Sequence, residues 1–134
     1  MRIKINILLV DDVEYSRELL RSALIACIRE QDAEIEPIFF HSSTGQSIVE
    51  QIQQRQINIV YLDIDLPGTN GLELLKEIRQ DHPNIMVVMV SGESSAENVS
   101  TAIKSGANGF IVKPFNSGRI FDSVQNYLKR VSKK

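Results

Sequence analysis

The segment NIVYLDIDLPGTNGLELL, residues Asn58–Leu75, starts as an apolar run and then becomes acidic. Asp63 ends the run, Asp65 follows two residues later, and Pro67 starts a glycine-containing exit. An ionised carboxylate beside apolar walls is costly unless a cation or hydrogen-bond donors compensate it. The segment therefore predicts a buried strand, a turn and a helix, with a compensated acid where the strand ends.

Length and composition are those of one globular domain. The chain has 134 residues, of which 43% are hydrophobic and 24% are charged, and its formal net charge is -2. These values are ordinary for a globular protein that buries a single core. Such a small negative charge gives no reason to expect binding to nucleic acid or to an anionic membrane.

Cysteine usage and the N-terminal sequence both favour a cytoplasmic protein. Cys27 is the only cysteine, so no internal disulfide can form, and its apolar neighbours predict a buried position. The first apolar run, Ile3–Val10, is too short for a signal peptide and ends in acid. No apolar stretch approaches the roughly 20 residues that cross a bilayer.

Apolar runs alternate with helical periodicity along the whole chain, which predicts an α/β fold with a doubly wound, five-stranded parallel sheet. Pro37 lacks a backbone donor and suggests an edge position for the second strand. Strands are predicted at Ile3–Val10, Glu34–Phe40, Ile57–Leu62, Ile85–Val90 and Gly109–Val112, and helices at Tyr15–Arg29, Thr44–Gln54, Leu72–Asp81, Ala96–Lys104 and Ser117–Val131.

Two helices carry more specific expectations. Arg17 is expected on the solvent face of the first helix. The fourth helix has a thin apolar stripe made of Ala96, Val99 and Ile103, with Gly106 capping its end. So thin a stripe is typical of a helix that moves at low cost.

Polar residues directly follow the central strands. Asp11 and Asp12 follow the first strand, Asp63 ends the third, Ser91 the fourth and Lys113 the fifth. The carboxyl ends of parallel strands lie along one rim, where open α/β sheets bind ligands. The sequence therefore predicts a crevice that holds several carboxylates, one hydroxyl and one ammonium group.

The charges in this crevice predict a magnesium site and phosphoryl chemistry. Carboxylates that crowd a partly dry site repel one another, and a hard divalent cation such as Mg²⁺ relieves this. Asp65 can add an oxygen from its backbone carbonyl or its side chain. Lys113 and Ser91 can bind the oxygens of a transferring phosphoryl group. Asp63, central and at the end of a rigid strand, is the expected phosphoacceptor.

Four motifs in register, ILLVDD, YLDIDLPGTNGLELL, VMVSGES and GANGFIVKPF, give the chain a resemblance to a known family. Over essentially its whole length it resembles the receiver domain of two-component response regulators, in particular the chemotaxis-type single-domain regulators. The resemblance implies a flavodoxin-like (βα)5 fold with strand order 2-1-3-4-5. It also implies that residues 1–134 form a single receiver domain.

The same resemblance implies roles for the acidic residues. Asp63 would be the phosphoacceptor, and Asp11 and Asp12 would be the acidic pair that binds Mg²⁺. Asp65 would contact the metal through its backbone.

The resemblance also implies a switch. Ser91 would be the switch hydroxyl, Lys113 the phosphoryl-binding lysine and Phe110 the switch aromatic, with a cis peptide bond before Pro114. A histidine kinase or a phosphotransfer protein would donate the phosphoryl group. The signal would leave through the fourth helix, fifth strand and last helix to a protein effector, and a homodimer is a further possible outcome.

Three other functions remain open on the residues alone. The Asp63-Ile64-Asp65 triplet also resembles a Mg²⁺-dependent phosphatase of the haloacid dehalogenase type, although Pro67 stands where that family has Thr or Val. A flavodoxin-like nucleotide-binding module needs a phosphate loop after the first strand, where VDDVEYS is acidic. A pseudo-receiver that binds partners without phosphorylation is the third alternative.

Overall fold

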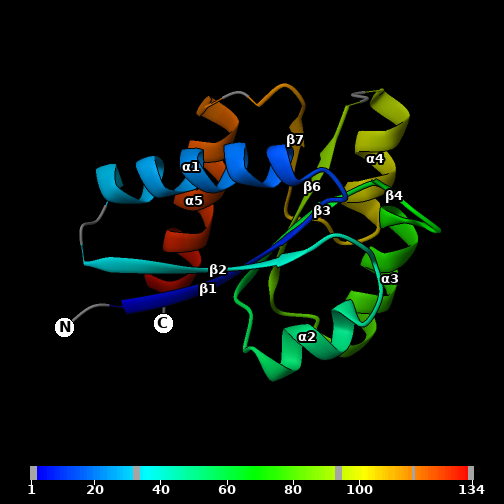
Figure 1. Cartoon of the computed structure of the whole chain (residues 1–134), viewed down its shortest axis with the longest axis horizontal. Coiled ribbons are helices and arrows are strands. Elements are labelled where there is room, and N and C mark those ends of the chain that lie inside the picture. The colour runs from blue at the N-terminus through cyan, green and yellow to red at the C-terminus, as the bar shows by residue number, and fades with distance from the viewer. Residues whose placement is uncertain (1–2, 32–33, 93–94, 116, 133–134) are drawn as a thin grey trace.

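A five-stranded parallel sheet forms the centre of the molecule and has helices on both faces (Figure 1). The computed structural model describes residues 3–31, 34–92, 95–115 and 117–132. The elements are β1 (Ile3–Val10), α1 (Glu14–Gln31), β2 (Ile35–Ser42), α2 (Ile48–Gln54), β3 (Ile59–Asp63), β4 (Asp65–Leu66), β5 (Thr69–Asn70), α3 (Gly71–Asp81), β6 (Met86–Ser91), α4 (Ala96–Lys104), β7 (Gly109–Val112) and α5 (Ser117–Ser132).

The strand order is β2-β1-β3-β6-β7, and all neighbouring strands are parallel. Counted within this sheet alone, the order is 2-1-3-4-5, which confirms the predicted flavodoxin-like α/β fold. β2 lies at one edge and contains Pro37 opposite Ile5, so the edge position expected from the proline is also confirmed.

The sheet separates two apolar layers, which explains why its central strands are apolar on both faces. Helices α1 and α5 cover one face, and α2, α3 and α4 cover the other (Figure 1). Side chains alternate along β3, so Tyr61 packs in the first layer and Leu62 in the second. Cys27 is buried in the first layer, as predicted, and burial raises the pKa of its thiol.

A buried hydroxyl pair joins β3 to α5. The Tyr61 hydroxyl lies 2.7 Å from Ser123 Oγ, and Ser123 Oγ donates to the Ile120 carbonyl over 2.7 Å. A serine hydroxyl has one proton, so Tyr61 must be the donor to Ser123. Burial raises the pKa of Tyr61, which keeps this proton in place.

Two local features differ from the prediction. β4 and β5 form a short antiparallel pair that was not predicted, because two-residue strands show no periodicity. α2 begins at Ile48 rather than at Thr44, since Ser47 has left-handed backbone angles (φ 58°) that interrupt a helix. A Cβ on Gly45 would lie 2.6 Å from Thr69 Cγ2, so the loop before α2 packs closely on β5.

The predicted apolar stripe of α4 is wrong in part. Ala102 is its buried residue, whereas Ala96 is exposed and the Ile103 side chain is 51% exposed. Gly106 follows the helix with φ 105°, and its amide donates to the Ile103 carbonyl over 3.1 Å, so the predicted glycine cap is confirmed. Among the residues that the structure describes, no helix combines the length and apolar character needed to cross a membrane.

Candidate functional site

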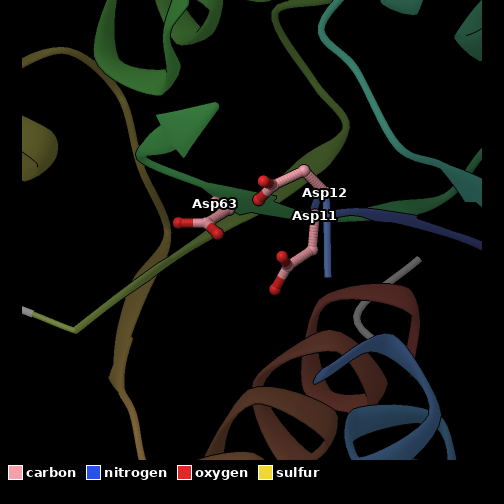
Figure 2. Close-up of side chains that lie close together, drawn as sticks. All are labelled: Asp11, Asp12 and Asp63. Atoms are coloured by element: carbon pink, nitrogen blue, oxygen red, sulfur yellow. The ribbon is translucent and has the colours of Figure 1, made fainter. Parts of the chain in front are cut away.

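Three carboxylates meet at the carboxyl rim of the sheet. Asp11 and Asp12 follow β1, Asp63 ends β3, and one oxygen of each lies within 4.8 Å of the others. Figure 2 shows the three side chains lying close together where β1 and β3 end. Asp11 is 6% exposed and Asp63 is 4% exposed, while Asp12 is open to solvent. The sequence prediction that distant acids gather here agrees with this geometry.

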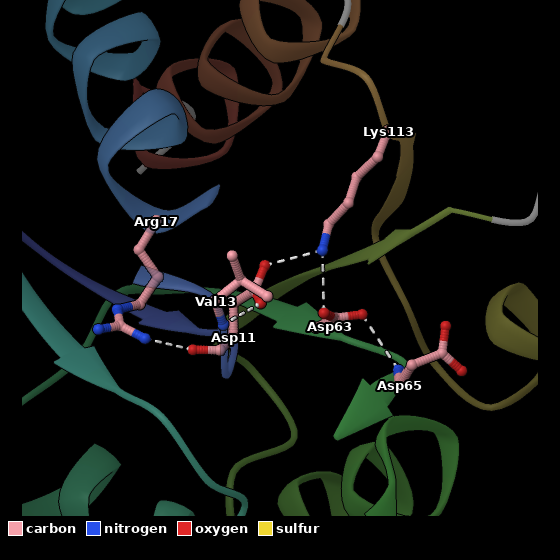
Figure 3. A network of polar contacts seen from close by, with 6 residues as sticks. All are labelled: Asp11, Val13, Arg17, Asp63, Asp65 and Lys113. Carbon is pink, nitrogen blue, oxygen red and sulfur yellow. Dashed lines mark hydrogen bonds and ion pairs between the residues drawn. The ribbon is translucent and has the colours of Figure 1, made fainter. Parts of the chain in front are cut away.

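Lys113 joins the two buried carboxylates. Its Nζ lies 2.8 Å from Asp11 Oδ2 and 3.0 Å from Asp63 Oδ2, as Figure 3 shows. The residue follows β7, and its own amide donates to the Ser91 carbonyl over 2.8 Å. One ammonium group therefore compensates part of the negative charge that two buried acids bring to the rim.

Burial and ion pairing shift the pKa values of Asp63, Asp11 and Lys113 in opposite directions. Burial raises the pKa of Asp63, and its hydrogen bonds offset this only partly. Burial also acts to raise the pKa of Asp11, but hydrogen bonds from Lys113, the Val13 amide and Ser16 outweigh it and hold that pKa below its ordinary value. For Lys113 burial lowers the pKa, and the two carboxylates more than compensate and raise it.

Arg17 lies closer to the site than expected. It is half-buried, its Nη1 donates to the Asp11 carbonyl, and its Nε donates to His41 Nδ1 over 3.3 Å. The prediction of a solvent-facing Arg17 is therefore wrong. Helical periodicity placed it correctly on α1, but it could not show that the loop from Asp11 folds back under the guanidinium group.

Asp65 contributes through its backbone. Its amide donates to Asp63 Oδ1 over 3.0 Å, while its own carboxylate points away from the other acids (Figure 3). This amide fixes the rotation of the Asp63 side chain. A metal contact from Asp65 would then come from its carbonyl rather than from its side chain.

Gly71, the first residue of α3, lies against the backbone at the end of β3. A Cβ at this position would lie 2.3 Å from the Asp63 carbonyl oxygen and 2.7 Å from Ile64 Cα. The Gly71 amide donates to the Ile64 carbonyl over 2.7 Å. The sequence marked Gly71 only as part of a turn, because close approach of backbone to backbone leaves no signal in a single sequence.

Replacing Gly71 by alanine is expected to destabilise the fold by about 2 kcal/mol, because the new methyl group forces α3 away from β3. The same shift displaces Asp63, the phosphoacceptor that the sequence predicts, so we expect phosphoryl uptake to slow as well. Urea denaturation and intact-mass kinetics measure the two effects. Gly92→Ala is the matched control, since nothing lies within 4 Å of a Cβ there. Equal stability of the two variants would contradict this reading of Gly71.

Ser91 and Phe110 lie in β6 and β7, the two strands that follow β3 in the sheet. Ser91 ends β6 and is buried, and Phe110 in β7 is half-buried and packs against the α2–α3–α4 layer. The Lys113–Pro114 peptide bond is cis.

A groove of about 810 Å³ runs from Lys113 past Phe110 between α4 and α5. Its other lining residues include Val99, Ile103, Arg119, Asp122 and Asn126.

The chemistry of the acidic cluster fits Mg²⁺. All of the available ligand atoms are carboxylate or carbonyl oxygens, which hard cations prefer. Each carboxylate oxygen of Asp63 accepts one hydrogen bond, Oδ2 from Lys113 and Oδ1 from the Asp65 amide, and retains a second lone pair. Asp12 adds an exposed carboxylate beside the two buried ones.

Comparison with known proteins agrees with the site. The family model described as response regulator receiver domain matches residues 7–125. The chain is a response regulator receiver domain. This membership places it in two-component signal transduction.

Individual relatives support the same assignment. The chemotaxis protein CheY of Thermotoga maritima is 32% identical, over 92% of this chain and 98% of that protein. The solved receiver domain of NtrX from Brucella abortus is 34% identical with a TM-score of 0.76, over 92% of this receiver and 98% of that chain. The CheY-like receiver domain of Methanospirillum hungatei JF-1 is 26% identical with a TM-score of 0.76, over 98% of each chain.

Proposed function

We propose that residues 1–134 form one cytoplasmic receiver domain that works as a phosphorylation-dependent switch. Asp63 accepts a phosphoryl group from a histidine kinase or a phosphotransfer protein. The observation that supports this most directly is the bridge of Lys113 Nζ between Asp11 Oδ2 and Asp63 Oδ2. A cation held between two buried acids is placed to bind the oxygens of an incoming phosphoryl group.

Asp63 is the better acceptor of the two buried acids. Its pKa is raised by burial, whereas Asp11 has additional hydrogen-bond donors and a lowered pKa. An oxygen of Asp63 attacks the phosphorus atom, the P–N bond of the phosphohistidine breaks, and the electron pair leaves with the imidazole. With acetyl phosphate the P–O bond breaks instead, and acetate leaves. Lys113 then offsets the charge that the new phosphoryl oxygens bring.

Asp11, Asp12, Asp63 and the Asp65 carbonyl are the residues that would hold Mg²⁺. When bound, the ion supplies positive charge that offsets the crowded carboxylates and the phosphoryl oxygens. The protein itself orients the acceptor, through the Asp65 amide and the close contact of Gly71 with β3. Positioning of Asp63 and compensation of the negative charge are therefore the two contributions to catalysis.

The output surface is the face made by α4, β7 and α5. New oxygens on Asp63 attract the Ser91 hydroxyl, the end of β6 shifts, and Phe110 moves inward. The groove beside Phe110 then changes shape, and a protein effector or a second copy of the chain reads the change. The single buried residue of α4 supports this choice of face, because a helix with little buried surface moves at low cost.

The proposal is tested by incubating the chain with acetyl phosphate, with Mg²⁺ or with excess EDTA, and measuring intact mass. We expect the addition of one phosphoryl group, only when Mg²⁺ is present. Borohydride reduction of the acyl phosphate should convert residue 63, and no other residue, to homoserine. Failure of acetyl phosphate and phosphoramidate to add mass would support the pseudo-receiver alternative. Sustained turnover of a phosphate monoester would support the phosphatase alternative.

A further inference from the structure

Among the residues that the structure describes, the contacts that attach helix α4 to the rest of the molecule lie mainly at its C-terminal end. Its buried residue, Ala102, lies in the last turn, and the Ala102 carbonyl accepts from the Ala107 amide over 2.9 Å. At the other end, Ser95 Oγ accepts from the Asn98 amide over 3.1 Å, which is a bond within the first turn. The two ends of the helix are therefore held very differently.

Arg79, near the end of α3, fastens the turn that follows α4. Its Nε donates to the Gly106 carbonyl over 2.9 Å, and its Nη2 donates to Asn108 Oδ1 over 2.6 Å. Its Nη1 donates to the Ile85 carbonyl over 2.7 Å and to the His82 carbonyl over 3.1 Å. One guanidinium group thus joins the end of α3, the start of β6 and the turn between α4 and β7.

Asn108 completes this attachment. Its side-chain Oδ1 also accepts from the Val87 backbone amide over 2.9 Å, and its backbone amide donates to the Val87 carbonyl over 2.7 Å. Gly106 packs so closely on Arg79 that an added Cβ would lie 3.0 Å from Nε. The turn after α4 is therefore fixed both to the sheet and to α3.

We propose that Arg79 and Asn108 form a fixed pivot for α4, so that phosphorylation moves the N-terminal end of the helix while its C-terminal end stays in place. This inference rests on the proposed function. The pivot lies where β6 and β7 begin, whereas Ser91 and Lys113 lie where the same strands end. A change at Asp63 thus reaches the end of β6 and the first turn of α4 first, and Arg79 acts as a positioning residue that opposes movement of the other end.

The experiment measures the two ends of α4 separately. Nitroxide pairs are placed at Gln53 and Glu97 and, in a second protein, at Gln53 and Lys104, in a Cys27→Ala background; all three labelled positions are exposed. Double electron–electron resonance gives the distance between the two nitroxides of each pair, with and without Mg²⁺ and beryllofluoride. Fluorine NMR of the same samples reports whether beryllofluoride is bound. We expect the Glu97 distance to shift and the Lys104 distance to remain unchanged.

Arg79→Lys and Asn108→Ala test the role of the two residues. In either variant we expect beryllofluoride to shift or broaden the Lys104 distance as well. Arg130→Lys is the matched control, since Arg130 Nη2 also donates to a backbone carbonyl, that of Asn84, over 2.8 Å, but from α5. It should behave as the wild type does.

Three outcomes would overturn the pivot. The first is a Lys104 distance that shifts in the wild type as much as the Glu97 distance, and the second is that neither distance shifts, in each case while fluorine NMR shows bound beryllofluoride. The third is an unchanged Lys104 distance in both folded variants. Absence of a bound fluorine signal in the wild type would instead count against the proposed function, on which the pivot depends.

Discussion

The Asp63→Asn variant is expected to take up no phosphoryl group from acetyl phosphate and Mg²⁺ while it keeps its fold. An amide oxygen is a far weaker nucleophile than a carboxylate oxygen, so the acyl phosphate cannot form. Asparagine retains an acceptor for the Asp65 amide, and it removes a negative charge that burial disfavours. The free energy of unfolding at neutral pH should therefore change by no more than about 1 kcal/mol.

The pKa of Asp63 also fixes how this comparison depends on pH. The pKa is raised in the folded state, so the stability that Asp63 contributes is present below its unfolded value of 3.8 and is lost as pH rises through the folded value. Measured without divalent cations, Asp63→Asn should therefore gain stability relative to the wild type between pH 3 and pH 7, a range of about four pH units. A relative loss over that range would contradict the assignment of a raised pKa.

Asp65→Asn is the control for the loss of phosphorylation. The Asp65 side chain is exposed and points away from the cluster, and the substitution leaves its backbone in place (Figure 3). We expect this variant to accept a phosphoryl group. Loss of phosphorylation in Asp65→Asn, or its persistence in Asp63→Asn, would show that the acceptor has been assigned to the wrong residue.

The Lys113→Met substitution is expected to have the second largest effect, both on stability and on phosphoryl uptake. Methionine replaces much of the aliphatic stem but removes the ammonium group that joins Asp11 to Asp63. Two buried carboxylates then face each other without a cation between them. The metal-free protein should lose about 2 kcal/mol of stability at neutral pH, and phosphoryl uptake should slow because no lysine binds the phosphoryl oxygens.

The pH dependence of this loss follows from two opposite pKa shifts. The raised pKa of Lys113 gives stability that is present below the unfolded value of 10.5 and is lost as pH rises through the folded value. The lowered pKa of Asp11 gives stability that is present above the unfolded value of 3.8 and is lost as pH falls through the folded value. The difference between wild type and Lys113→Met should therefore be greatest between these limits.

Urea denaturation in EDTA across the pH range measures this difference. The double variant Asp63→Asn with Lys113→Met should recover part of the lost stability, because only one buried carboxylate then remains. A double variant less stable than Lys113→Met would contradict the electrostatic origin of the effect.

The fold and the acidic centre could be predicted from the sequence because they depend on patterns that are local. An apolar strand followed by an acid is visible at Asp11 and at Asp63, and parallel topology brings strand ends to one rim whatever loops connect them. Lys113 could be placed for the same reason. The geometry brings it to both acids.

Other features depend on contacts between distant segments and leave no periodic signal. The guanidinium donors of Arg79 find these acceptors only when α3 and the turn after α4 are packed together, so its sequence position suggested nothing. The face of α4 was misplaced because Ile103 is the larger apolar residue, whereas it is the small Ala102 that is buried in the second apolar layer. Ser47 shows the same limit, since a non-glycine residue with left-handed backbone angles gives no signal in the sequence.

The hydroxyl pair between Tyr61 and Ser123 constrains how the groove can open. Apolar layers permit slippage, but sliding α5 along the sheet would take the tyrosine proton away from its acceptor among hydrocarbon side chains. The last helix is thereby registered to the very strand that bears Asp63. We therefore expect α5 to stay in place on the sheet, so that a change in the shape of the groove comes from α4 on its other side.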